Sequence, residues 1–158
     1  MQVVKRNSKL WKYLSEELRG LIEDGEGLLT ECHSLSGKIS DYSYLVFPFA
    51  KAYEGFLKHF FLDLGLITDA EFFGDDIRIG KILNPYFMKQ PFSVYTKLKH
   101  HHGDEEIPRQ LWEIWIKGRN QVFHYFPHNF RKLSRTEAAE IIDGFVRAMT
   151  LGVGSLEK

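Results

Sequence analysis

The sequence is poor in cysteine, with Cys32 alone among 158 residues. A single cysteine excludes an internal disulfide and a cysteine-based zinc cluster, and it agrees with a reducing compartment. Repeats, low-complexity tracts and long linkers are also lacking, and the composition is even from end to end. We therefore expect one domain that spans residues 1–158.

Charge of one sign is not in excess, because 21 Lys and Arg balance 21 Asp and Glu. The zero net charge excludes attraction of the whole molecule to nucleic acid, so any phosphate binding must be local. The longest apolar run covers residues 44–50, contains Pro48 and is far too short for a membrane span. Residues 1–10 carry three basic side chains with no apolar core behind them, unlike a secretory signal. These features predict a cytoplasmic protein with no membrane partner.

Apolar residues recur at intervals of three and four along most of the chain, and 44% of the residues are hydrophobic. This spacing is typical of amphipathic helices, whereas no segment alternates with the period of a strand. We predict an all-α, compact bundle of four long helices plus short ones. The long helices are expected over 8–23, from Asp41 or Ser43 to about Gly65, over 108–126 and from Ser134 onward, with short ones over 75–83 and 91–100.

Several residues mark the expected ends and weak points of these helices. Gly25 and Gly27 are expected to weaken the first helix, and residues 28–38 either resume it or form a turn. Pro48 predicts a kink in the second helix or else its true start. Ser134 with Glu137 three residues later has the spacing of a capping box.

A polar lane follows the fourth predicted helix, where Glu113, Lys117, Asn120 and His124 are spaced by four, three and four residues. Arg109 extends this lane one turn back. Arg119 lies about 100° around the helix from the lane, on a side otherwise made of aromatic and aliphatic residues. A guanidinium in such surroundings is expected to stack on a ring, bind an anion or lie at an interface.

These residue types suit RNA cleavage, because RNA carries its own nucleophile in the 2′-hydroxyl. Cleavage then needs a base for that hydroxyl, an acid for the leaving oxygen and a cation for the phosphate, but no metal. His124 can act as base or acid, Arg119 can bind two phosphate oxygens, and Asn120 can orient the imidazole. Since one chain supplies one such histidine, a two-fold homodimer through this helix would complete the site, with Gly118 allowing close approach of the two helices.

The string Arg119-Asn120-Gln121-Val122-Phe123-His124 resembles the Arg-Asn-x3-His signature of the HEPN ribonucleases. Residues 53–58 resemble the core helix of the RNase LS (RnlA-type) toxin HEPN domain, and the likeness extends from about residue 41 to residue 126. The resemblance implies a compact helical bundle and a metal-independent endoribonuclease that needs no cofactor. It implies a toxin or antiphage effector restrained by a protein antitoxin. Carried over, Arg119 and His124 are the catalytic pair, Asn120 assists, and Glu54 contributes an acidic group.

Two departures from the family limit what the resemblance implies about regulation. HEPN toxins that are silenced by AMP transfer carry a tyrosine two residues after the histidine, whereas this chain has Phe126 there and its tyrosine at Tyr125. RnlA-type toxins also have additional N-terminal domains that contact the antitoxin. The antitoxin of this chain therefore cannot be taken from that subfamily.

Some candidate residues have a plainer interpretation. Glu54 is also spaced to form ion pairs with Lys51 and Lys58 on a solvated strip of helix. His100 to His102, followed by three acidic residues, suggests a metal site, but adjacent side chains diverge and a solvated loop is favoured. The basic residues Arg131, Lys132 and Arg135 are either diffuse phosphate contacts or an ordinary charged surface.

Two rival functions remain open at this point. The first is a non-catalytic HEPN-like module that binds RNA or a nucleotide, or that scaffolds a defence complex. The second is a dimerising helical adaptor with no nucleic acid partner, which the zero net charge permits. RNA cleavage, RNA binding without cleavage, and no RNA binding separate the three.

Overall fold

Helices make up all of the regular secondary structure in the part of the chain described by the computed structural model, residues 1–35, 39–127 and 131–156. The predicted all-α class is thus confirmed. The elements are α1 (Lys9–Tyr13), α2 (Glu16–Glu31), η1 (Cys32–Leu35), η2 (Tyr42–Leu45), α3 (Phe47–Asp63), α4 (Asp69–Phe73), α5 (Ile79–Ile82), η3 (Pro85–Phe87), α6 (Val94–His102), α7 (Glu106–Ile114), η4 (Trp115–Asn120) and α8 (Arg135–Ser155).

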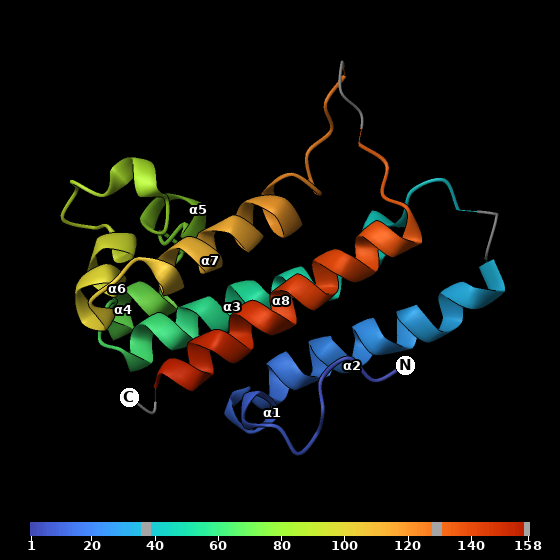
Figure 1. Cartoon of the computed structure of the whole chain (residues 1–158), viewed down its shortest axis with the longest axis horizontal. Helices are drawn as coiled ribbons and strands as arrows, with labels where there is room; N and C mark the ends of the chain where they lie inside the picture. Colours follow the sequence, from blue (N-terminus) through green and yellow to red (C-terminus); the bar gives the residue numbers. More distant parts are fainter. Residues whose placement is uncertain (36–38, 128–130, 157–158) are drawn as a thin grey trace.

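The helices α2, α3 and α8 and the continuous segment formed by α7 and η4 make up the body of the molecule (Figure 1). Helix α3 contacts α2 and α8, and α8 also contacts α7. The short helices α4, α5 and α6 gather at one end of these segments, whereas the chain that follows η4 rises away from the other end. The two halves of the candidate site thus come from α3 and from the segment η4, which contact each other.

The first long helix differs from the prediction, because it is two helices. Leu14 has an extended backbone with ψ of 137° and separates α1 from α2. Ser15 is the reason: its hydroxyl accepts a hydrogen bond from the Leu18 N–H, as a helix N-cap does. The apolar spacing continues across the break, and Leu10, Leu14 and Leu18 are all buried.

The expected weakening at Gly25 and Gly27 is also wrong, since α2 continues through both residues to Glu31. Gly25 lies directly against the ring of Phe49 on α3. A Cβ at position 25 would come within 2.5 Å of that ring. The missing side chain therefore lets α2 and α3 approach closely, and this packing offsets the low helix propensity of glycine.

Pro48 is at the start of α3 rather than at a kink, which is the second of the two alternatives for this residue. The 3-10 turn η2 precedes it, with Asp41 as its cap. At the other end α3 stops at Asp63, and Gly65 follows with a φ of 67°. Glycine adopts this left-handed conformation without steric cost, so it ends the helix as predicted.

Aromatic rings from α3 and α8 fill the core. Phe56 stacks on Tyr53 and on Phe60, and Tyr53 also contacts Phe145 of α8 with 4.9 Å between ring centroids. All four rings are fully buried. Helix α8 begins with the predicted capping box of Ser134 and Glu137. Because these rings fix α3 against α8, they also fix where Glu54, which follows Tyr53 on α3, lies relative to α8.

Candidate functional site

The fourth long helix does not continue as an α-helix to residue 126. It is α-helical from Glu106 to Ile114, π-helical from Trp115 to Asn120, and then ends. The last bond of the π segment runs from the Gln121 N–H to the Ile116 carbonyl. The predicted continuous polar lane is therefore wrong beyond Asn120, because each π turn holds more residues than an α turn and His124 lies beyond the helix.

Gly118 serves packing within the chain, which corrects its expected role between two subunits. A Cβ on this residue would lie 2.5 Å from the Phe145 ring and 2.9 Å from Ile141, both on α8. The buried Gly118 thus brings the π segment down onto α8. Earlier on the same segment, in α7, the Leu111 carbonyl accepts a hydrogen bond of 2.8 Å from the buried Tyr53 hydroxyl. This bond ties α3 to α7.

Arg119 makes two of the three contacts expected for a guanidinium among aromatic residues. Its Cζ lies 5.2 Å from the ring centroid of Trp115. One of its terminal nitrogens, Nη2, lies 3.6 Å from Oε2 of Glu54. At that distance the pair is an ion pair rather than a hydrogen bond, and both side chains remain more than one-third exposed. Donors of the guanidinium are therefore left for a ligand.

Glu54 pairs with the motif arginine and not along its own helix. The ion pairs of the described residues include none between Glu54 and Lys51 or Lys58. The alternative of a strip of ion pairs on α3 is thus not what the structure shows. Instead, the fold brings residue 54 to residue 119, which only tertiary packing can do.

Asn120 and His124 contact each other across the end of the helix. The distance from Asn120 Oδ1 to His124 Nε2 is 3.2 Å. The tautomer of the ring sets the direction of this contact: with Asn120 Oδ1 as the acceptor, Nε2 is the donor and Nδ1 is the nitrogen that remains free of this contact. The two side chains are thus close, as their spacing predicts, and the orienting role of Asn120 stays a prediction.

Three of the four predicted site residues line one open hollow of about 380 Å³ between α3 and residues 119–124. We call these residues the motif segment and the hollow the motif hollow. Glu54 comes from α3, Arg119 from η4, and His124 from the chain that follows. Asn120 is not part of the lining but contacts His124. The full lining is Phe47, Ala50, Lys51, Glu54, Arg119, Phe123 and His124.

Four lining residues were not among the predicted site residues: Phe47, Ala50, Lys51 and Phe123. Phe47 and Phe123 form an edge-to-face pair with 5.7 Å between centroids, although they are 76 positions apart in the sequence. Their side chains are exposed, with 54% and 39% of the residue accessible. The sequence alone shows that Phe47 lies just outside the buried stripe of α3. It does not show that the Phe123 ring packs against it.

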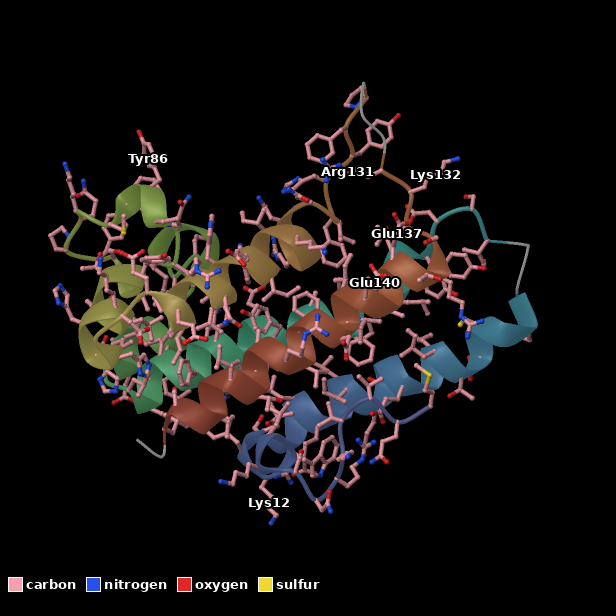
Figure 2. The ribbon with its side chains drawn as sticks, in the orientation of Figure 1. Lys12, Tyr86, Arg131, Lys132, Glu137 and Glu140 are labelled. Carbon is pink, nitrogen blue, oxygen red and sulfur yellow. The ribbon has the colours of Figure 1, made fainter. Side chains whose placement is uncertain are left out.

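The basic residues after the motif lie beside acidic ones. Arg131 and Lys132 are on the chain that leads down into α8, and Glu137 and Glu140 are on the first turns of α8 below them (Figure 2). All four line a second hollow of about 420 Å³, together with Lys117 and Gln121. The Arg131 guanidinium donates to the Gln121 side chain at 2.9 Å. This surface is mixed in charge, which favours the plainer interpretation.

His100 to His102 form the last turn of α6, and not the predicted loop. Gly103, with a φ of 81°, ends the helix after them. Partial negative charge at a helix C-terminus suits histidines at this place. In residues 1–35, 39–127 and 131–156, no group of three or more His, Cys, Asp or Glu side chains is arranged to hold a metal ion.

No family model, characterised protein or solved structure matches this chain. The site must therefore be judged on its own residues. In the described ranges, no helix is both long enough and apolar enough to cross a membrane.

Proposed function

We propose that this protein is a metal-independent endoribonuclease of the HEPN type, acting as a toxin or antiphage effector. One observation carries the proposal: Glu54, Arg119 and His124, which the resemblance selects from two distant segments, line the same hollow. The geometry supplies an exposed imidazole with a fixed partner and a guanidinium with donors to spare. These supply two of the three groups that cleavage by the 2′-hydroxyl requires, a base and a cation.

In the proposed reaction, the imidazole of His124 removes the proton from the 2′-hydroxyl. The 2′-oxygen then attacks the adjacent phosphorus, and the bond from phosphorus to the 5′-oxygen breaks. The leaving 5′-oxygen takes up a proton, so the products end in a 2′,3′-cyclic phosphate and a 5′-hydroxyl. Arg119 contacts the non-bridging oxygens as their charge grows, and Glu54 holds the guanidinium in place.

Protonation of the leaving oxygen is the reason to propose a homodimer. The described lining holds one imidazole, and a two-fold partner would bring a second one to act as the acid. Tyr125 and Phe126 follow the motif directly, and 72% and 39% of these residues are accessible. Such exposed aromatic residues beside the hollow suit a subunit contact.

Cleavage of a single-stranded RNA in EDTA tests the activity. We expect His124→Ala and Arg119→Ala each to slow cleavage roughly a hundredfold or more. Matched controls are His100→Ala and Arg109→Ala, an exposed histidine and an exposed arginine away from the hollow, which should cleave like the wild type. Activity that survives both motif substitutions, or that EDTA abolishes, contradicts the proposal.

A non-catalytic RNA-binding module gives a different outcome in the same assay. RNA would then bind but remain intact after long incubation at high protein concentration. Sedimentation of the wild type tests the dimer, and a monomer with full activity would contradict the composite site.

The toxin role predicts a cellular effect. Expression of the wild type should arrest growth, whereas expression of His124→Ala at the same level should not. Relief of the arrest by co-expression of a small adjacent gene would identify the protein antitoxin. Equal growth with both forms would leave the nuclease without the proposed role.

A further inference from the structure

The lining of the motif hollow contains two chemically different groups of residues, and the proposed reaction uses one of them. The first group is Glu54, Arg119 and His124. The second is the edge-to-face rings of Phe47 and Phe123 together with Lys51, which lies one helical turn before Glu54. Neither the rings nor the lysine take part in the proton transfers, so their presence in the lining calls for a separate explanation.

Both rings are exposed although they pack against each other. Phe47 is the first residue of α3, and its neighbours Pro48 and Phe49 are buried while 54% of Phe47 is accessible. Phe123 reaches the same place from the end of the motif segment. The two ring planes make an angle of 87°, so a nucleobase can stack on the face of one ring and contact the edge of the other.

Lys51 adds a cation that has no partner in the ion pairs of the described residues. It is exposed and lines the hollow with Arg119, which keeps donors beyond its contact to Glu54. An ammonium and a guanidinium around one hollow suit an anion with several oxygens, such as a phosphodiester. A base platform beside a phosphate site matches the two parts of a nucleotide.

We propose that the hollow binds one unpaired nucleotide, with its base stacked on one of the perpendicular rings of Phe47 and Phe123 and in contact with the other, and with a phosphate between Lys51 and Arg119. The inference rests on the proposed function and specifies its substrate as single-stranded RNA. A base within a duplex is covered on both faces by its neighbours and cannot reach the platform. The volume of about 380 Å³ is in the range of small-ligand sites.

The test uses binding and not cleavage, so that it is independent of the activity. The probe is a fluorescent 2′-O-methyl oligoribonucleotide, which cannot be cleaved by its 2′-oxygen, measured by anisotropy as a single strand and as a duplex. We expect the single strand to bind at least roughly tenfold more tightly than the duplex, and Phe123→Ala and Phe47→Ala to weaken single-strand binding roughly tenfold each. Lys51→Ala should weaken it and lower the salt slope by about one.

Matched controls are Phe73→Ala, an exposed ring outside the hollow, and Lys58→Ala, two turns further along α3 than Lys51. Both should bind like the wild type. Thermal unfolding and circular dichroism of each variant show whether it folds, and Phe47→Leu, which keeps an apolar residue at the start of α3, replaces Phe47→Ala if the latter does not.

Equal binding of duplex and single strand overturns the inference, as does wild-type binding by Phe123→Ala and Lys51→Ala. A change in sedimentation of Phe123→Ala without a change in affinity also overturns it, since the ring would then serve a subunit contact. The outcomes separate the two proposals. If the oligonucleotide binds as predicted but unmodified RNA is not cleaved, the nuclease is refuted and the nucleotide site stands. If cleavage depends on His124 but not on Phe123 or Lys51, the nuclease stands and the nucleotide site is refuted.

Discussion

Among the described residues, an arginine that pairs with a glutamate also lies over a tryptophan ring near the N-terminus and at the candidate site. Arg6 Nη2 lies 2.5 Å from Glu26 Oε2, and the Arg6 Cζ is 3.9 Å from the Trp11 ring centroid. Glu26 also accepts hydrogen bonds from the Val3 and Val4 N–H groups, at 2.7 and 3.1 Å. The side chain of Glu26 is only 9% exposed.

The pair at the candidate site is looser in every respect. Arg119 and Glu54 are 3.6 Å apart, and their side chains are 39% and 34% exposed. The tryptophan of this pair, Trp115, is 5.2 Å from the guanidinium, compared with 3.9 Å at the N-terminus. The fully hydrogen-bonded pair around the nearly buried Glu26 holds the N-terminal residues against α2, whereas the pair beside the hollow leaves donors of Arg119 unused and available to a ligand. The difference separates a structural ion pair from a candidate functional one.

Replacing each arginine by lysine should give the largest contrast. We expect Arg119→Lys to slow RNA cleavage roughly a hundredfold, because an ammonium cannot contact two phosphate oxygens as a guanidinium does. Arg6→Lys should leave cleavage within about twofold. Initial rates with one RNA substrate measure both. Equal loss in the two variants would mean that stability, and not phosphate contact, limits the activity.

Replacing each glutamate by glutamine should give the larger loss of stability at the N-terminal pair, and the larger loss of cleavage at the candidate site. Glu26→Gln is expected to lower the free energy of unfolding by about 2 kcal/mol, because it removes the charge that pairs with Arg6 in a nearly buried place. Glu54→Gln should change it by less than about 0.5 kcal/mol, since solvent screens that pair, but it should slow cleavage. Urea unfolding and cleavage rates of both variants check this. A large loss of stability in Glu54→Gln would identify its pair as structural.

A Cβ at Gly118 tests how firmly the core sets the candidate site. Gly118→Ala should destabilise the protein by about 1–2 kcal/mol and lower cleavage, because the added methyl meets Phe145 at 2.5 Å. Gly27→Ala is the control, since no atom lies within 4 Å of a Cβ there, and it should stabilise by about 0.5 kcal/mol. Melting temperatures distinguish the two, and a stable, active Gly118→Ala would contradict the packing.

The smallest expected effect is a pH dependence of the stability that Glu26 contributes. Burial raises the pKa of Glu26, but hydrogen bonds from Arg6, Val3 and Val4 outweigh it and lower this pKa below the usual 4.5. A lowered folded-state pKa stabilises the protein above about pH 4.5, and this contribution is lost as pH falls through the folded-state value. The stability gap between wild type and Glu26→Gln should therefore narrow below pH 4.5. Urea unfolding from pH 7 to pH 3 checks this, and a constant gap would contradict it.

The local sequence pattern was sufficient to predict the helical class, the capping box of α8 and the end of α3 at Gly65, because these depend on residues within one or two turns. It failed where local signals compete. Ser15 caps a new helix within a continuous apolar stripe, and Gly25 lies in an unbroken helix because a ring from α3 packs on it. Neither outcome is visible in the spacing alone.

For the candidate site, the sequence placed Arg119, Asn120 and His124 close together, since four or five positions on or near a helix keep side chains neighbours. The sequence did not predict the π-helical turns, the hollow or the pairing of Phe47 with Phe123 in its lining. They depend on Tyr53, Phe145 and Gly118, which fit α3, α8 and η4 together.

The sequence by itself determined that this chain is helical and which side chains could carry proton transfer and phosphate contact, because periodicity and residue chemistry are local properties. Only the tertiary structure decided that Glu54 faces Arg119, that Phe47 meets Phe123, and that the motif begins in a π segment and ends beyond it. The physical reason is that these contacts join residues 65 and 76 positions apart, and the packing of buried rings sets their distance.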